Sequence, residues 1–286
     1  MTPKVALVTG ATQGLGLALV GGLASRLSTE DTVYLTGRDA GRVAQAVDAR
    51  PAGGAEVRGE VFDVAEPGAA GRLAALLAER HGGVDVVIGN AVMRVGPDDD
   101  MRAIIGAYAE VNNFGTTRLL RAFAPLLRDD GRFLVVASSL GTLHHLAPAL
   151  HDRFDGLSSL DEVDKQVAAW RDAVEDGSAR AGDWPGFVNI PSKIGQVAAV
   201  RALAAQRRDD DLARGILLAA VCPGMINTPT SALWWDVRDA PSPARAAEAV
   251  LDLVFRPVEP AQYGELVRFG AVRSWKPSAQ GGVQRT

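Results

Sequence analysis

Cysteine and lysine are scarce in this chain of 286 residues. Cys222 is the only cysteine, so no disulfide can form within the chain. A single thiol suits a reducing compartment, and we expect a cytoplasmic location. Lysine occurs only at Lys4, Lys165, Lys193 and Lys276, and the net charge is −4 with a pI of about 5.6. This charge balance excludes a general affinity for nucleic acid or for an anionic membrane surface.

Long hydrophobic runs are also lacking. No apolar stretch reaches the roughly 18 residues of a transmembrane helix, and Met1 to Lys4 lead directly into a strand-like run rather than a signal peptide. We therefore expect no membrane partner, and we expect no metal site. With 47% apolar and 22% charged residues, the composition predicts a globular protein, with room for one large α/β domain or two small ones.

The stretch from residue 4 to residue 26 joins a strand, a glycine-rich turn and a helix. An apolar run ends at Val8, and Thr9 to Gly16 follow with the spacing T-G-x-x-x-G-x-G. Apolar residues then recur at helical spacing from Leu17 to Ala24. Glycines allow backbone N–H groups to approach a pyrophosphate, and the helix N-terminus favours negative charge. The order predicts a phosphate-binding element, with a glycine-rich surface turn as the alternative.

Strand-like and helical runs alternate through most of the chain. Further strands are predicted over 33–36, 56–62, 84–88, 132–137 and 215–221, and further helices over 42–49, 68–80, 101–127 with a break near Pro125, 193–207 and 244–254. Repeated β-α units favour a doubly wound parallel sheet, the α/β Rossmann fold, in a single domain spanning residues 1–276.

Two segments interrupt this alternation. Residues 143–187 form a helical insertion with an amphipathic stretch over 160–174, and an insertion of this length is expected to be structured. Residues 225–243 follow the sixth strand and contain Trp234 and Trp235, which predicts a lid over a substrate. The tail over 277–286 is polar.

With these elements assigned, the chain resembles the short-chain dehydrogenase/reductase family along nearly its whole length. The resemblance depends on residues at the ends of successive strands: Thr9 to Gly16, Asp63-Val64, Asn90-Ala91, Asn112, Ser138-Ser139, Lys193, and Pro223-Gly224 with Thr228. The insertion with Trp184-Pro185 is similar to the monomeric carbonyl-reductase branch, where it covers the helices that tetrameric relatives use for assembly. The resemblance therefore implies a monomer.

The end of the second strand predicts the cofactor. An acidic residue there would bind a ribose 2′-hydroxyl, whereas this strand ends in Thr36-Gly37-Arg38. The Arg38 guanidinium can pair with a 2′-phosphate, which favours NADP(H). The alternative is a surface arginine paired with Asp39. Carbonyl reductases often have a second basic residue, a lysine, where Gln13 stands.

The resemblance also implies which residues touch the cofactor. Asp63 and Val64 would bracket the adenine, Asn90 would lie near the adenosine ribose, and the loop from Pro223 to Thr228 would cover the nicotinamide. Asp63 as a helix cap and Pro223-Gly224 as a simple turn are the alternatives. The full expected set is Gly10, Thr12, Gln13, Gly14, Leu15, Gly16, Arg38, Asp63, Val64, Asn90, Lys193, Pro223, Gly224, Ile226 and Thr228.

The catalytic residues depart from the family at one position. The family reduces carbonyls with a Ser, a Tyr and a Lys, supported by an Asn, and the Tyr stands four residues before the Lys. Here Ser139, Lys193 and Asn112 are present, but the residue four before Lys193 is Asn189. An amide donates a hydrogen bond but delivers no proton at neutral pH, and general acid catalysis is worth roughly 10²–10⁴-fold. Hydrogen bonds from Ser139 and Asn189 would recover part of this loss.

The missing acid suggests that the substrate supplies the proton. A ketone beside a phenol in a fused aromatic system carries an internal O–H···O=C hydrogen bond, and Trp234 and Trp235 suit such a flat ligand. His144 and His145 are other candidate donors, or polar loop residues. The combination is similar to the atypical ketoreductases of angucyclinone antibiotic biosynthesis, such as that of simocyclinone, and implies NADPH-dependent reduction of a polycyclic polyketide ketone. An inactive NADP(H)-sensing protein and a cofactor-dependent cyclase or dehydratase are the alternatives.

Overall fold

A computed structural model describes residues 2–49 and 53–277 as one α/β unit built on an eight-stranded sheet. The strand order is β3-β2-β1-β4-β5-β6-β7-β8, and every neighbouring pair is parallel except β7 and β8. The strands are β1 (Val5–Val8), β2 (Thr32–Gly37), β3 (Glu56–Val61), β4 (Val84–Gly89), β5 (Leu127–Val136), β6 (Leu217–Cys222), β7 (Leu266–Arg268) and β8 (Ala271–Arg273). The predicted doubly wound fold is confirmed, and its order reverses between β1 and β4.

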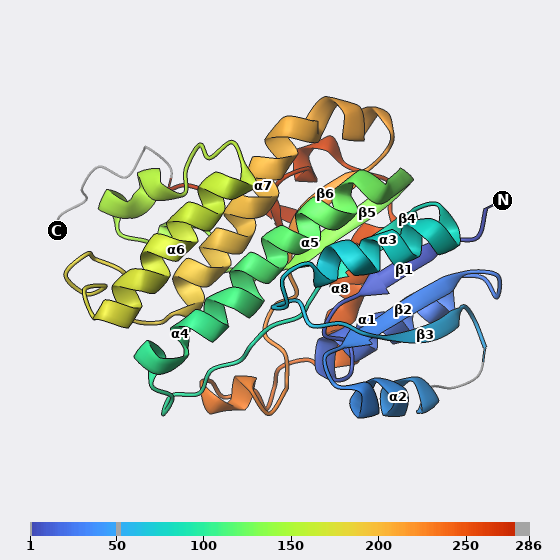
Figure 1. The fold of residues 1–286 in the computed structure, drawn as a ribbon, viewed down its shortest axis with the longest axis horizontal. Helices are drawn as coiled ribbons and strands as arrows, with labels where there is room; N and C mark the ends of the chain where they lie inside the picture. Colours follow the sequence, from blue (N-terminus) through green and yellow to red (C-terminus); the bar gives the residue numbers. More distant parts are fainter. Residues whose placement is uncertain (1, 50–52, 278–286) are drawn as a thin grey trace.

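Helices cover both faces of this sheet (Figure 1). One layer holds α3, α4, α5 and α7, while α1 and α8 pack against each other behind the strands. The bounds are α1 (Gly14–Arg26), α2 (Ala40–Asp48), α3 (Ala69–His81), α4 (Met101–Ala109), α5 (Gly115–Phe123), α6 (Leu160–Asp176), α7 (Asn189–Ala213) and α8 (Pro243–Phe255). Short helical turns are η1 (Glu110–Phe114), η2 (Ala124–Leu126), η3 (Leu143–His145), η4 (Pro148–Arg153), η5 (Ser231–Leu233) and η6 (Pro260–Gln262).

The burial of each strand explains which strands the sequence predicted. All residues of β1, β2 and β6 are buried, as expected for parallel strands covered on both faces. The edge strand β3 is largely exposed and carries Glu56, Arg58 and Glu60, which protect an unpaired edge. The β7–β8 hairpin, which the sequence analysis did not predict, extends the opposite edge with three residues in each strand.

The helix that carries Lys193 begins earlier than predicted. We expected this helix over residues 193–207, and α7 spans Asn189–Ala213 instead. Pro191 lies in its first turn, where a missing backbone N–H breaks no intrahelical hydrogen bond. Asn189 therefore lies on the first turn of α7, one turn before Lys193.

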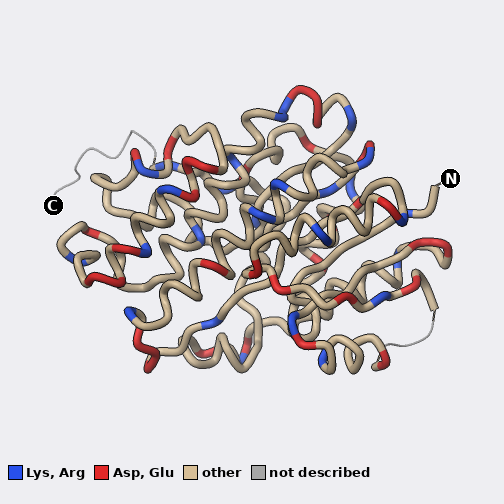
Figure 2. The backbone as a smooth tube through the Cα atoms, viewed as in Figure 1, with Lys and Arg blue, Asp and Glu red and all other residues tan. Residues whose placement is uncertain are grey.

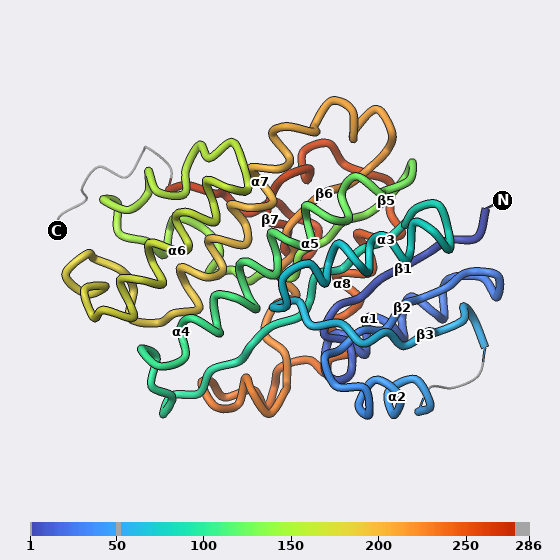
Figure 3. The backbone as a smooth tube through the Cα atoms, in the orientation of Figure 1, coloured from blue at the N-terminus to red at the C-terminus, as the bar shows by residue number. Residues whose placement is uncertain are grey.

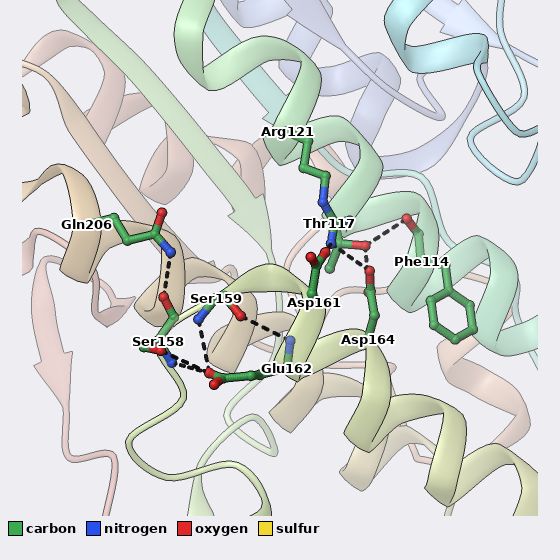
Figure 4. A network of polar contacts seen from close by, with 9 residues as sticks. All are labelled: Phe114, Thr117, Arg121, Ser158, Ser159, Asp161, Glu162, Asp164 and Gln206. Atoms are coloured by element: carbon green, nitrogen blue, oxygen red, sulfur yellow. Dashed lines mark hydrogen bonds and ion pairs between the residues drawn. The ribbon is translucent and has the colours of Figure 1, made fainter.

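The insertion contributes α6, which packs against α4 and α7. Its N-terminus has a capping box: Ser159 accepts from the Glu162 backbone, and the Glu162 carboxylate accepts from the Ser159 backbone. Ion pairs join Arg121 of α5 to Asp161 and Asp164, and Thr117 donates to Asp164 (Figure 4). The N-terminus of α6 is therefore fixed to the central helix layer by several polar contacts.

Charged residues of both signs are distributed over the molecule (Figure 2). They lie mostly on helices and turns, while the central strands carry few of them. Among residues 2–49 and 53–277, no helix is both long and apolar enough to cross a bilayer. Of the polar tail expected over 277–286, residues 278–286 lie outside the described part.

Candidate active site

The glycine-rich turn lies at the carboxyl end of β1, where the strand order reverses. The Thr9 hydroxyl accepts from the backbone N–H groups of Asn90 (2.9 Å) and Ala91 (3.0 Å). The Asn90 amide donates to the carbonyls of Thr9 and Gly10, both at 3.0 Å. Asn90, expected beside the adenosine ribose, thus uses its amide to shape the turn. Gly10 has φ +60°, and a methyl group there would lie 2.6 Å from Ala91 Cα, so only glycine fits.

The N-terminus of α1 is open to an anion. No side chain caps the N-terminus of α1, a property that it shares with α3, α5 and α7, whereas α2, α4, α6 and α8 begin with an Asp or Ser that accepts from their first turn. The first-turn N–H groups of α1 are therefore available to a ligand. A methyl group at Gly16 would lie 2.6 Å from both Gly10 O and Asn90 Nδ2, which explains the second required glycine of this turn.

Three arginines surround this turn, and sequence reasoning found only one of them. Arg38 is exposed at the end of β2, and Asp39 caps α2 by accepting from the Arg42 backbone at 2.8 Å. In the described chain Arg38 forms no ion pair with Asp39. Arg42 Nη2 donates to Gln13 Oε1 at 2.7 Å, so a second basic group lies beside Gln13, where the resemblance implied a lysine. The only signal for Arg42 was its spacing, one helical turn after Arg38.

Arg94 is the third. Its guanidinium lies 3.7 Å from the position that a side chain at Gly14 would take, and it donates to Thr230 Oγ1 at 2.7 Å. Burial and the nearby charge of Arg42 both lower the pKa of Arg94. Within residues 2–49 and 53–277 it has no carboxylate partner. Arg94 and Arg42 thus concentrate positive charge at the open end of α1.

The other expected cofactor residues lie at the carboxyl ends of the strands. Asp63 follows β3 and accepts from the Ala65 backbone at 2.9 Å, so it caps a turn, while Val64 is buried beside Gly115. After β6, Gly224 has φ +84°, and Thr228 Oγ1 lies 3.0 Å from Ser231 Oγ at the start of η5. Thr12 lies against Gly37 of β2, and Leu15 is buried in α1, with Ile226 and Pro223 in the loop after β6.

Lys193 is held by the side-chain amide of Gln196 and by a backbone carbonyl. Its Nζ donates to Gln196 Oε1 at 2.7 Å and to the carbonyl of Val136, at the end of β5, at 3.3 Å. Gln196 Nε2 in turn donates to the carbonyl of Asn112 at 2.8 Å and to Thr116 Oγ1 at 3.1 Å. Burial lowers the pKa of Lys193 to about 8. Gln196, which the sequence analysis missed, therefore couples Lys193 to Asn112.

Asn112 lies in η1, a π-helical turn between α4 and α5. Such turns occur often at functional sites because they free backbone groups from the regular helical pattern. Both ends of the Asn112 side-chain amide contact Met93: Oδ1 accepts from Met93 N at 2.7 Å, and Nδ2 donates to Met93 O at 3.1 Å. The Asn112 backbone carbonyl accepts from Thr116 Oγ1 and from Gln196 Nε2, both at 2.8 Å. Asn112 thus connects the β4–α4 loop, through Met93, to Lys193, through Gln196.

Asn189 has a phenol beside it. Tyr108 of α4 donates from its hydroxyl to Asn189 Oδ1 at 2.5 Å, although the two residues are 81 positions apart. Tyr108 is fully buried, and burial raises the pKa of its phenol to about 12. Tyr108 lies 85 residues before Lys193 in the sequence, and the tertiary structure brings its hydroxyl to Asn189, one helical turn before that lysine.

Ser139 lies in the turn after β5, next to α7. A methyl group at Gly141 would lie 2.9 Å from the Lys193 carbonyl oxygen, so this turn packs directly on the helix. Ser139 is half-buried. His144 and His145 lie in η3 and are both exposed, which agrees with polar loop residues.

An aromatic cluster stands over the start of α7. Phe187 contacts Trp234 at a ring-centroid distance of 5.0 Å and Trp235 at 6.1 Å. Trp234 Nε1 donates to the carbonyl of Val95 at 3.0 Å. Figure 3 shows the segment around η5 beside the loop that leads into α4. Phe187, absent from our expected residues, lies two positions before Asn189.

This arrangement, a glycine-rich turn at the reversal point of a doubly wound sheet, defines a dinucleotide-binding fold. A family model described as short chain dehydrogenase matches residues 4–148. The chain is 31% identical over 281 residues to carbonyl reductase (NADPH) 3 of Mus musculus, covering 95% of this chain and 98% of the relative. Carbonyl reductase (NADPH) 1 of the same species is 30% identical, with the same two coverages. The chain belongs to the short-chain dehydrogenase/reductase family.

Solved structures show the same fold. Menthone neomenthol reductase from Mentha piperita superposes with a TM-score of 0.74 at 22% identity, over 95% of this chain and 100% of that one. An NADPH-bound carbonyl reductase from chicken fatty liver superposes with a TM-score of 0.68 at 18% identity, over 96% and 100%. The expected family is therefore confirmed, together with its carbonyl-reductase relatives.

Proposed function

We propose that this protein reduces a ketone on a flat, polycyclic phenolic substrate, such as an aromatic polyketide in antibiotic biosynthesis, and uses no tyrosine as the acid. It is an NADPH-dependent carbonyl oxidoreductase, in keeping with its family and relatives. One observation carries the finer proposal. The carboxamide of Asn189 stands at the position of the family's tyrosine, and the phenol beside it is buried and already donates to that carboxamide.

The arginines and the open helix end fit NADP(H). The first turn of α1 and Arg94 would hold the pyrophosphate, and Arg38 with Arg42 would bind the 2′-phosphate. Lys193 would hold the nicotinamide ribose. NADPH, when bound, supplies a hydride to the carbonyl carbon of the substrate. β2 ends in Gly37 and is followed by Arg38, so no carboxylate occupies the position that would bind a ribose 2′-hydroxyl and repel a 2′-phosphate.

The chain's own residues stabilise the developing oxyanion rather than protonate it. The Asn189 amide and the Ser139 hydroxyl donate hydrogen bonds to the carbonyl oxygen, and the positive charge of Lys193 favours negative charge nearby. As the C–H bond forms, the oxygen takes the proton of the neighbouring substrate phenol. The phenolate then regains a proton from water. Atoms and charge balance without a protein acid.

The mouth of the site suits an apolar, flat ligand. Val92, Met225, Leu233 and Trp235 are all exposed, and all lie in the loops after β4 and β6. Exposed apolar groups gathered at one site mark a binding surface. The segment 225–243 would act as the substrate lid, joined to the β4–α4 loop through Thr230 and Trp234.

A ketone panel tests the substrate class. We expect turnover of peri-hydroxy polycyclic ketones and at least about 10²-fold slower turnover of their O-methyl ethers, because the ethers lack the proton. The measurement follows NADPH absorbance. Equal rates for the phenol and its ether would contradict substrate assistance. If no ketone reacted although NADPH bound, the reductase proposal would fail, and a sensing role or a cyclase or dehydratase activity would replace it.

Two variants of Asn189 test whether its NH₂ group donates a hydrogen bond to the substrate or whether the side chain only fills space. Asn189→Ala is expected to lower kcat about 10²-fold, because one oxyanion donor is lost. Asn189→Asp retains the oxygen that Tyr108 contacts but replaces the NH₂ group by an anionic oxygen, so we expect at least an equal loss. Steady-state kinetics with the phenolic ketone measure both. Wild-type rates in Asn189→Asp would show that the amide N–H groups contribute nothing.

We further infer a monomeric, cytoplasmic enzyme. The insertion helix α6 covers part of α7, where Gly195 lies so close that a methyl group would be 3.1 Å from Val167 Cγ2. A helix face covered by the chain itself is not available to a second copy. The one cysteine, Cys222, is buried and free, which suits a reducing compartment. Light scattering with size exclusion would test the monomer.

A further inference from the structure

Tyr108 is the one phenol in contact with the active-site amide. It lies near the C-terminal end of α4, fully buried, with its ring edge-on to Trp170 of α6 at 6.5 Å between centroids. Its hydroxyl donates to Asn189 Oδ1 at 2.5 Å. The proposed reaction gives this hydroxyl no role of its own.

The geometry makes Tyr108 a poor proton donor to substrate. Its ring has no exposed surface, so a ligand cannot reach its hydroxyl without rearrangement. Its proton is already directed at the Asn189 oxygen, and burial raises the pKa of the phenol to about 12. A group with these properties holds a neighbour in place rather than releasing a proton at neutral pH.

The contact selects one orientation of the Asn189 amide. The terminal carboxamide of an asparagine rotates broadly about its Cβ–Cγ bond, and its oxygen and NH₂ ends are nearly equal in size. With the carboxamide oxygen facing it, the buried O–H group has an acceptor. A reversed amide would donate from its NH₂ group to the phenol oxygen and would leave the phenol proton without this acceptor, at the cost of a hydrogen bond. With the oxygen directed at Tyr108, the NH₂ group is directed elsewhere, and Asn189 is only half-buried. In the described chain the Asn189 side chain makes no other hydrogen bond.

We propose that Tyr108 is a positioning residue, which directs the Asn189 NH₂ group toward the substrate carbonyl. This inference rests on the proposed donor role of Asn189. In this arrangement a tyrosine hydroxyl lies behind the proposed donor and does not contact the substrate itself. The arrangement retains a directed hydrogen bond at the reacting oxygen, but it transfers no proton.

The first test compares Tyr108→Phe with Tyr263→Phe. The Tyr263 hydroxyl is also buried and donates to Asp211 at 2.7 Å, away from the site, so its loss reports on stability alone. We expect Tyr108→Phe to lower kcat about 10-fold or more while the KM of the ketone and the affinity for NADPH change less than about 2-fold. Tyr263→Phe should lower the melting temperature and leave kcat unchanged. Equal kcat in Tyr108→Phe and wild type would overturn the proposal.

A double-variant cycle tests whether Tyr108 acts through Asn189. In the Asn189→Ala background, Tyr108→Phe is expected to cost nothing further, because its only route to the substrate is gone. A further 10-fold loss there would show that the phenol acts on its own, and the positioning role would be wrong.

A spectroscopic readout keeps the inference independent of turnover. The side-chain NH₂ signals of Asn189 are assigned by their loss in Asn189→Ala, using ¹⁵N-labelled protein. A hydrogen bond at the carboxamide oxygen slows rotation about the C–N bond, so Tyr108→Phe should accelerate exchange between the two protons. Tyr263→Phe should not. If no ketone reacted, the proposed function would fall while this measurement still decided the orientation, and unchanged exchange would overturn the orientation alone.

Discussion

Lys193→Met is expected to lower kcat/KM about 10³-fold, because both the ribose contact and the positive charge beside the oxyanion are lost. No other lysine lies on α7, so no neighbouring lysine on this helix can replace the charge of Lys193. Gln196 and Val136 would lose their partner but cannot supply a charge. Steady-state kinetics with a phenolic ketone measure this loss. Lys165→Met, on α6, is the matched control and should retain wild-type rates. A variant that kept a tenth of the activity would contradict the role.

The pH dependence of Lys193 gives a second measurement on the same variant. Burial lowers the pKa of Lys193 to about 8 from 10.5, so folding disfavours the charged form. Between these two values the unfolded chain binds more protons, and the free energy of unfolding therefore rises with pH from about 8 to 10.5. Below pH 8 the penalty is fully present. Denaturation between pH 7 and 9.5 should show this rise in wild type and not in Lys193→Met. Activity should fall as pH passes 8, where the charge is lost.

The double variant Arg38→Ala with Arg42→Ala is expected to weaken NADPH binding about 10²–10³-fold, because two charge-assisted contacts to the 2′-phosphate are lost. NADH lacks this phosphate, so its affinity should change less than about 5-fold. Titration calorimetry with both cofactors measures the difference.

The control for this experiment is Arg72→Ala. Arg72 is an exposed arginine on α3 that pairs with Glu66, and it lies away from the glycine-rich turn. Its removal should leave both affinities unchanged. Equal losses for NADPH and NADH in the double variant would show that the arginines act on a part common to both cofactors.

The sequence predicted the sheet well because its central strands are buried on both faces. β1, β2 and β6 are continuous apolar runs, and each lies between turn or helix signals. The β7–β8 hairpin gave no such signal, since each strand has three residues and β8 is exposed. The early start of α7 was hidden by Pro191, which ends most helical patterns but is allowed in a first turn.

The residues proposed to contact ligands differ in how they could be found. Local spacing was enough for the glycines of the turn, for Arg38 at the end of β2 and for Asn189 four residues before Lys193. Arg42 and Arg94 needed the fold, because their positions around Gly14 depend on the packing of α2 and the β4–α4 loop against α1. Charge around a turn is a property of several segments at once.

By itself the sequence determined the family, the doubly wound sheet and the position of Asn189 four residues before Lys193, since each of these depends on residues close together along the chain. Only the tertiary structure brought Tyr108 to Asn189, across 81 residues, and Gln196 to Asn112, across 84. These contacts depend on how α4 and η1 pack against α7. Periodicity and motifs report local structure, whereas a hydrogen bond between distant helices depends on the relative placement of two packed surfaces.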